Sequence, residues 1–279
     1  MAWFDGLKVL SLETRRREEM LTLIEKYEGV PTVVPSLREV ALDTNTELMR
    51  FVERLEAGNV DYLVCMTGVG TRMFLRDVVK CYPEALKALR NVNIVIRGNK
   101  PLKALKEFGL SGIMVKKPHT WREVQDFLLS ISLQDAFVSI LEFGEPTPIV
   151  LMDSLKEQGA TVQSIPVYRC VLPEDPTPLQ EAVRGCIRGE FDVLLLSSGT
   201  QIVHFLKCAR DMGLEFDLRQ SLKRMVICSI GPACSEAVGD LDLSMDVEAS
   251  PHKMGILVRQ ASENAAGILQ QKRPVTSWF

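Results

Sequence analysis

The chain is poor in the residues that build metal centres and disulfide frameworks. Its 279 residues include only three histidines and seven cysteines. The cysteines stand singly, and no Cys-x-x-Cys pair occurs. Zinc sites and disulfide scaffolds need closely spaced ligands or paired cysteines. The sequence therefore predicts a reduced protein without a metal site.

Long apolar runs and a leader pattern are also missing. No apolar stretch approaches the ~20 residues of a membrane-spanning helix. The N-terminal segment lacks a basic region followed by an apolar one. A formal net charge of -3 argues against a nucleic-acid binder that relies on bulk charge. We expect a cytoplasmic protein whose partners include neither a membrane nor nucleic acid.

Two common catalytic loops are incomplete. The run from Met66 to Gly70 lacks the full G-x-G-x-x-G pattern and the Lys-Ser/Thr ending of a P-loop. Ser197 and Ser198 are not embedded in a G-x-S-x-G nucleophile elbow. Nucleotide binding and acyl transfer are therefore disfavoured.

The sequence contains an internal repeat. Four segments recur in the same order at offsets of 130 to 133 residues: 58–68 with 189–199, 97–105 with 230–238, 117–119 with 250–252, and 29–38 with 159–169. This period is too long for a solenoid, so each copy has the size of a domain. The 46% hydrophobic content supplies enough apolar material for two buried cores.

Within each copy, short apolar runs alternate with amphipathic stretches of helical period, which predicts parallel α/β layers. The expected strands are 8–12, 32–34, 61–66, 92–96, 113–115, 148–152, 161–165, 193–196, 225–230 and 245–247. The expected helices of the first copy are 16–27, 44–57, 71–80 and 121–129.

Small, hydroxyl-bearing and basic residues follow the predicted strands. In parallel sheets, ligands bind beyond the carboxyl ends of strands, where helix N-termini offer unpaired N–H groups. The candidate ligand-binding residues are Arg15, Thr67, Gly68, Arg97, Gly98, Lys100, Ser197, Ser198, Gly199, Thr200, Gly231 and Cys234. Helix capping explains Thr67 and Ser198 equally well, so both roles stay open. For His119 and His252, which each follow a proline, we expect a structural role at a helix entry.

Several of these segments together resemble the uroporphyrinogen-III synthase family. The resemblance rests on Val9-Leu10 with Thr14-Arg15, on Pro166 to Arg169, on Leu196 to Gly199, on Ile230-Gly231-Pro232 with Ala237, and on Pro251 with Gly255. It covers residues 7 to 270, and the first half, including Gly144 to Pro146, is similar to a bacterial subgroup. Cys234 and Ser197 stand where the family usually has threonine.

The resemblance implies an α/β fold with two similar parallel-sheet domains, a two-strand linker and an interdomain cleft. One domain is expected to combine residues 1–35 and 172–279, and the other to span the inserted residues 38–168. Residues 35–38 and 166–169 are repeat equivalents, which suits a pair of linkers.

The resemblance also implies the activity. The expected substrate is hydroxymethylbilane, a linear tetrapyrrole with eight carboxylates. A lyase of this family closes it with loss of water and inverts ring D through a spiro intermediate. Such chemistry asks for positioning and one proton donor, and it needs no cofactor. Tyr168 is the expected donor, because a phenol with a pKa near 10 is protonated at neutral pH; its repeat equivalent is Leu37.

Other functions stay open on the sequence. We expect a monomer in which Arg15, Arg97, Lys100 and strand-end N–H groups receive the substrate carboxylates. The two threonine departures leave room for a non-catalytic module that binds a tetrapyrrole or a small anion. A two-domain solute-binding protein would suit the repeat but would need an export signal. Residues 271–279 are predicted to be disordered or to bind a partner, with disorder preferred.

Overall fold

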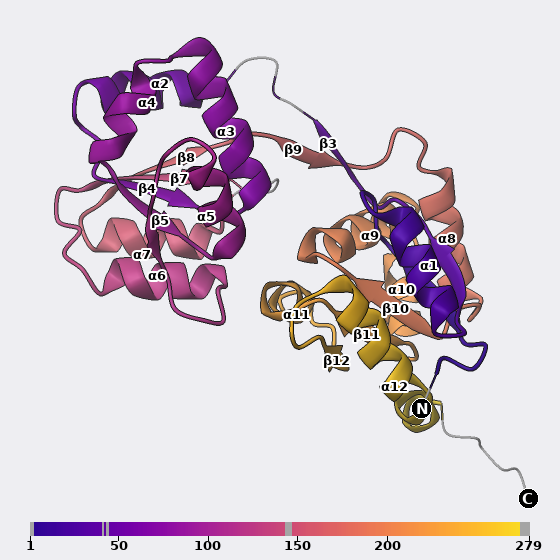
Figure 1. Ribbon diagram of the computed structural model, residues 1–279. Helices are drawn as coiled ribbons and strands as arrows, with labels where there is room; N and C mark the ends of the chain where they lie inside the picture. The colour runs from indigo at the N-terminus through magenta and orange to yellow at the C-terminus, as the bar shows by residue number, and fades with distance from the viewer. Residues whose placement is uncertain (1–2, 41, 43–44, 143–146, 274–279) are drawn as a thin grey trace, which may run out of the picture. The chain divides into compact units, whose positions relative to one another are not determined.

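The computed structural model describes the chain except for residues 1–2, 41, 43–44, 143–146 and 274–279. The segment Gly144–Pro146 and the last six residues of the tail therefore lie outside the described residues. The disorder predicted from residue 271 was wrong for Gln271 and Lys272, which are helical, and Lys272 pairs with Asp246 at 2.5 Å. The chain divides into two compact units, one of Met1–Arg38 with Val171–Phe279 and the other of Glu39–Cys170. Each unit carries its own parallel sheet covered by helices, which confirms the predicted fold class (Figure 1).

The first unit is built on a five-stranded parallel sheet of order β12-β11-β10-β1-β2. Its strands are β1 (Lys8–Ser11), β2 (Val30–Val33), β10 (Val193–Leu196), β11 (Val226–Ser229) and β12 (Val247–Glu248). Its helices are α1 (Arg17–Lys26), α8 (Thr177–Ile187), α9 (Gly199–Asp211), α10 (Glu215–Leu222), α11 (Pro232–Gly239) and α12 (Met254–Lys272).

The second unit repeats this sheet with the order β6-β5-β4-β7-β8. Its strands are β4 (Tyr62–Cys65), β5 (Asn93–Ile96), β6 (Ile113–Met114), β7 (Phe137–Leu141) and β8 (Thr161–Ile165). Its helices are α2 (Thr46–Glu56), α3 (Gly68–Cys81), α4 (Ala85–Ala88) with the 3₁₀ turn Leu89–Asn91, α5 (Asn99–Lys106), α6 (Trp121–Leu129) and α7 (Ile149–Glu157).

Strand alternation gives each sheet two apolar faces. In the second unit, Leu63 and Ile94 face the core formed with α2 to α5, whereas Val64 and Val95 face the core formed with α6 and α7. The first unit is divided in the same way, with α8 to α11 on one face and α1 and α12 on the other. Strands buried on both faces read as continuous apolar runs, which is why they could be recognised in the sequence.

The strand predicted at residues 148–152 was wrong. This segment begins helix α7 (Ile149–Glu157), in which Leu151 and Leu155 are buried at helical spacing. The side chain of Ile149 is 74% exposed. A short apolar run has no period that separates a buried strand from a helix. The strand belonging to this region is β7, which the sequence analysis missed.

The two sequence copies do not correspond to the two sheets, because each sheet combines strands from both copies. Strands β1 and β2 of the first copy complete the sheet of β10 to β12, while β7 and β8 of the second copy complete the sheet of β4 to β6. The chain passes between the units through β3 (Arg38–Val40) and β9 (Arg169–Val171), which pair in a two-stranded sheet.

Asp61 and Asp192 join the strands of the two copies. The backbone N–H of Phe137 in β7 donates to Asp61 Oδ2 at 2.8 Å, and the backbone N–H of Lys8 in β1 donates to Asp192 Oδ2 at 2.8 Å. The carbonyl of Asp61 also accepts from Asn93 at 3.0 Å. In each unit, one aspartate thus links three neighbouring strands at their N-terminal ends.

Loss of the Asp61 carboxylate is expected to destabilise the second unit. Asp61→Ala leaves the part-buried N–H of Phe137 without its acceptor, which costs about 1–3 kcal/mol. Asp61→Asn keeps an acceptor oxygen and should cost less. Urea unfolding checks this, with Asp126→Ala on the exposed side of α6 as control. Equal stability of Asp61→Ala and the control would contradict the role given to Asp61.

Candidate functional site

The carboxyl end of β4 leads directly into α3. Thr67 caps this helix, because its Oγ1 accepts the N–H of Gly70 at 3.1 Å. A Cβ on Gly68 would lie 2.8 Å from the backbone oxygen of Lys100. Glycine at residue 68 is therefore what lets the N-termini of α3 and α5 approach each other, and the capping role expected for Thr67 is present.

The carboxyl end of β5 brings Arg97 and Gly98 to the same edge. Gly98 precedes α5, and a Cβ on it would lie 3.4 Å from the Cβ of His119. Arg97 is half-buried, and desolvation lowers the pKa of its guanidinium, while the neighbouring Tyr168 acts in the opposite direction. Among the described residues no carboxylate forms an ion pair with Arg97. Lys100 is exposed in the first turn of α5.

Tyr168 lies within the second unit, between β8 and β9, and only 4% of it is exposed. It packs with the apolar core on the α2–α5 face of the sheet. Arg97 and Tyr168 are 71 positions apart in the sequence, yet Tyr168 lies within electrostatic range of the Arg97 guanidinium. A half-buried cation without a carboxylate partner favours the approach of an anion.

The corresponding edge of the first unit carries the serines. Ser198 caps α9 in a capping box with Gln201. Ser197 accepts from Gln201 Nε2 at 2.8 Å and donates to Glu13 Oε2. A Cβ on Gly199 would lie 2.4 Å from the Cβ of Ala237, so α9 and α11 meet closely there. Thr200 follows in the first turn and is partly exposed.

Gly231 and Cys234 begin α11. Gly231 has a φ of 159°, and a Cβ on it would lie 2.9 Å from the ring of His252. Cys234 is 3% exposed, and its Sγ lies 3.8 Å from the carbonyl oxygen of Leu196. Burial raises the pKa of this thiol to about 12. Cys234 therefore acts as a small apolar residue and is not brought to the surface of the strand ends.

Glu13 was missed by the sequence analysis. It follows β1, is 6% exposed, and accepts the backbone N–H groups of Arg15 and Arg16 at 3.0 and 3.1 Å. It thereby holds the segment that leads into α1, on which Arg15 is exposed. Glu142 occupies the same place after β7 and accepts from Ser164 Oγ at 2.9 Å. The signal in the sequence that could have identified Glu13 was the glutamate at the matching position after each of the strands β1 and β7.

Comparison with known proteins places the chain in a family. The family model described as uroporphyrinogen-III synthase HemD matches residues 18–259. This chain is a member of the uroporphyrinogen-III synthase family. The resemblance inferred from the strand-end motifs is thereby confirmed.

Individual relatives are distant in sequence. The "Uncharacterized protein YjjA" of Bacillus subtilis (strain 168) is 25% identical over 259 residues, which is 91% of this chain and 94% of that protein. A mutant uroporphyrinogen III synthase from the extremely thermophilic bacterium Thermus thermophilus has a similar crystal structure, with 22% identity and a TM-score of 0.76 over 94% of this chain and 100% of that chain. The structure of uroporphyrinogen-III synthetase from Helicobacter pylori 26695 is also similar, with 14% identity and a TM-score of 0.52 over 92% of this chain and 99% of that chain. At these identities the solved structures show the fold alone.

His119 and His252 occupy equivalent places in the two units. Each follows a cis proline, Pro118 or Pro251, and lies against the glycine that ends a neighbouring strand. His252 Nδ1 is 2.7 Å from the carbonyl oxygen of Ala249. These contacts agree with the structural role expected for both histidines.

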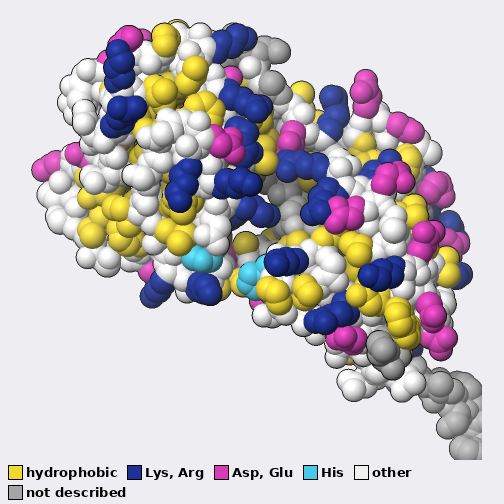
Figure 2. Space-filling model, in the orientation of Figure 1, with side chains coloured by type: hydrophobic (Ala, Val, Ile, Leu, Met, Phe, Trp, Pro, Cys, Tyr) yellow, Lys and Arg dark blue, Asp and Glu magenta, His cyan; other side chains and the backbone are white. Residues whose placement is uncertain are grey.

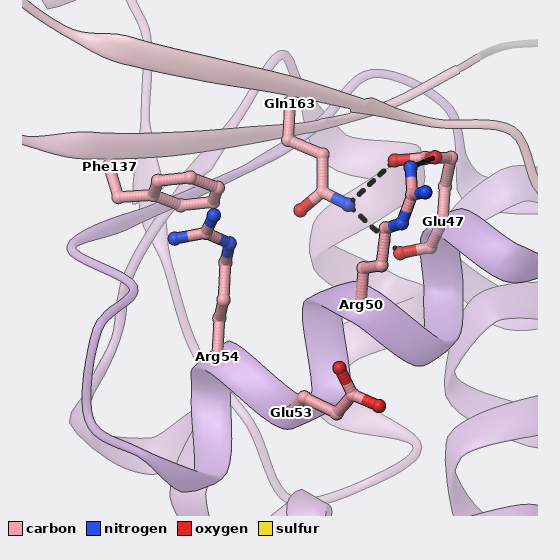
Figure 3. Close-up of a pocket in the computed structure, with 6 residues that line it drawn as sticks. All are labelled: Glu47, Arg50, Glu53, Arg54, Phe137 and Gln163. Carbon is pink, nitrogen blue, oxygen red and sulfur yellow. Dashed lines mark hydrogen bonds and ion pairs between the residues drawn. The ribbon is translucent and has the colours of Figure 1, made fainter.

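A shallow cavity of about 470 Å³ lies away from the strand ends, between α2 and strands β7 and β8 (Figure 3). The guanidinium of Arg54 lies 4.4 Å from the centre of the Phe137 ring, and Arg50 pairs with Glu47 at 2.7 Å. Gln163 Nε2 donates to the carboxylate of Glu47 at 3.0 Å. The cations of this cavity already have partners, and none of the predicted site residues lines it.

Metal ligands are not grouped in the part of the chain that the structure describes. Within the described residues, no three His, Cys, Asp or Glu side chains come together as a group that could hold a metal ion. No helix in the same part of the chain is long and apolar enough to cross a membrane.

The seven thiols are expected to differ sharply in reactivity. Cys81 is exposed, whereas burial raises the pKa of Cys65, Cys186 and Cys234 to about 12. At about pH 8 these three thiols are protonated and screened, so a thiol reagent should label Cys81 first. Peptide mass spectrometry after brief labelling checks this, and Cys81→Ser should remove the fast phase. Fast labelling of Cys234 would contradict the burial described here.

Proposed function

We propose that the chain is a uroporphyrinogen-III synthase, which cyclises hydroxymethylbilane with inversion of ring D, as a monomer in the cytoplasm. The observation that carries the proposal is the burial of Tyr168 at the carboxyl edge of the second sheet, within electrostatic range of Arg97. Membership of the synthase family supplies the reaction class.

Substrate binding in this proposal uses the strand ends. Arg97 and Lys100, together with Arg15 on the first unit, receive carboxylates of the tetrapyrrole through charge-assisted hydrogen bonds. The first N–H groups of α3 and α9, next to Gly68 and Gly199, are oriented for the same anions. The glycines keep side chains out of the way of the ligand.

Tyr168 acts as the proton donor of the first step. Its hydroxyl gives a proton to the leaving hydroxyl of hydroxymethylbilane, so that water departs and an azafulvene forms. The Arg97 cation stabilises the negative charge that develops on the Tyr168 oxygen. The substituted α-carbon of ring D then attacks the azafulvene methylene and forms the spiro intermediate. The bond between ring D and the bridge to ring C breaks, and this bridge bonds to the other α-carbon of ring D, which loses its proton, so that ring D is inverted.

Burial of Tyr168 suits this role. The azafulvene is an electrophile that water would capture, so the reacting ring must be shielded. Tyr168 lies on the apolar side of the sheet with Val167, which is 3% exposed. Its repeat equivalent, Leu37, has no proton to donate, and Ile230 takes the place of Arg97 in the first unit. The proposal therefore assigns the proton transfer to the second unit and carboxylate binding to both.

The activity is tested by supplying fresh hydroxymethylbilane, oxidising the products and separating the type I and type III isomers. The wild-type chain is expected to give type III in excess over a sample without protein. Type I alone from folded protein would overturn the proposal. A non-catalytic module that binds tetrapyrroles would then be the better description.

Tyr168→Phe removes the proton and keeps the ring that packs in the core. We expect it to lower the rate of type III formation by about 10- to 10⁴-fold while the protein stays folded. Tyr27→Phe is a matched control, because Tyr27 caps α1 in the other unit. Wild-type turnover by Tyr168→Phe would exclude Tyr168 as the donor.

A further inference from the structure

Basic side chains are concentrated in one part of the chain. Residues 68–117 contain eleven Lys or Arg and three Asp or Glu, which gives a formal net charge of +8. The whole chain has 33 basic and 36 acidic side chains. The remaining residues therefore carry 22 basic and 33 acidic side chains. This segment comprises α3, α4 with the following 3₁₀ turn, β5, α5 and β6 of the second unit.

The cations form two stripes on neighbouring helices. Arg72, Arg76 and Lys80 recur every fourth residue along α3, and Lys100, Lys103 and Lys106 recur every third residue along α5. Residues at these spacings share one side of a helix. We call these six residues the basic face; Figure 2 shows dark-blue side chains over the region where Figure 1 places α3 and α5.

The two stripes meet across one glutamate. Arg72 binds Glu107 through Nε and Nη2, both at 2.7 Å. The pKa of Glu107 is lowered first by this hydrogen bond and further by the charges of Lys103 and Arg76. Glu107 thus pairs with Arg72 and lies within the electrostatic range of Lys103 and Arg76. In the part of the chain that the structure describes, none of the other five cations of the basic face forms an ion pair.

The repeat provides an internal comparison. Helices α9 and α11 of the first unit pack against each other as α3 and α5 do. Their residues at the positions of the basic face are Val203, Lys207, Asp211, Ala233, Glu236 and Gly239. The formal net charge of these six residues is -1, whereas that of the basic face is +6. The same pair of helices packs in the first unit without these cations, so the fold does not require them. Binding of a negatively charged ligand explains why one copy has them.

We propose that the basic face is a polycarboxylate-binding surface, which receives the acid side chains of the tetrapyrrole outside the reacting ring. This inference rests on the proposed function for the identity of the ligand. The stripe of α5 begins at Lys100, three residues after Arg97, and extends for about 9 Å along the helix. A row of this length spans several acid side chains of one macrocycle, so affinity depends on how many carboxylates the ligand carries.

The test uses two porphyrins as probes. Uroporphyrin I has eight carboxylates and coproporphyrin I has four on the same ring system. Binding to the full chain is measured by porphyrin fluorescence at two salt concentrations. The wild type should bind uroporphyrin I more tightly, and salt should reduce this preference. Equal affinity for both probes would overturn the inference.

Lys103→Gln with Lys106→Gln removes two cations of the basic face and leaves Arg97 and Tyr168 unchanged. We expect uroporphyrin I to bind about 3- to 30-fold more weakly, from the usual strength of exposed ion pairs, with a smaller loss for coproporphyrin I. The matched control is Lys87→Gln with Lys156→Gln, two exposed lysines of the same unit that pair with Glu84 and Asp153. An equal loss in this control would overturn the inference.

The outcome is separable from that of the isomer assay. A chain that gives no type III isomer but loses uroporphyrin affinity on removal of Lys103 and Lys106 refutes the synthase and upholds the surface. Type III formation together with unchanged affinity in this variant refutes the surface and upholds the synthase. Tighter binding of a DNA duplex than of uroporphyrin I, with loss in the same variant, would also refute the polycarboxylate assignment.

Discussion

A single aspartate in front of the central strand of each sheet ties together strands from distant parts of the chain. Asp61 precedes β4 and holds β5 and β7, and Asp192 precedes β10 and holds β11 and β1. In both cases the side chain bonds the strand that comes from the other sequence copy. Each sheet is completed by two strands from the other sequence copy. Because of this exchange of strands, the chain must pass between the units twice, through β3 and β9.

This exchange explains why much of the fold could be predicted from the sequence and where the prediction failed. Matching glycines, aspartates and strand runs revealed the duplication, since strands buried on both faces are continuously apolar. The repeat alone could not say that β1 and β7 change places, because periodicity carries no information on pairing between distant strands. β7 was missed and its neighbour α7 was taken for a strand because a short apolar run has no period that separates a buried strand from a helix.

The candidate site was predictable in part. Residues at strand ends could be named, since parallel sheets bring these ends to one edge, and Thr67, Arg97 and Ser197 do lie there. The proximity of Arg97 and Tyr168 depends on how β8 folds back beside β7, which no local pattern encodes. Glu13 escaped notice because a single acidic residue after a strand usually faces solvent, and only the structure shows it buried against Ser197.

The two copies have kept one scaffold and diverged in chemistry. The cis prolines, the histidines beside strand-end glycines and the capped helices occur in both units. Arg97, Tyr168 and the basic face occur in the second alone, with Ile230, Leu37 and a nearly neutral helix pair as their counterparts. In the first unit, the carboxylate of Glu13 instead accepts the backbone N–H of Arg15. In the proposed mechanism the two units therefore have different tasks, with proton transfer confined to the second.

The most direct measurement is a crystal structure of the full chain with uroporphyrinogen III bound. We expect a carboxylate within hydrogen-bond distance of the Arg97 guanidinium, and the methylene bridge that closes the macrocycle against the Tyr168 hydroxyl. Product bound away from both residues, for example in the cavity beside α2, would contradict the central claim.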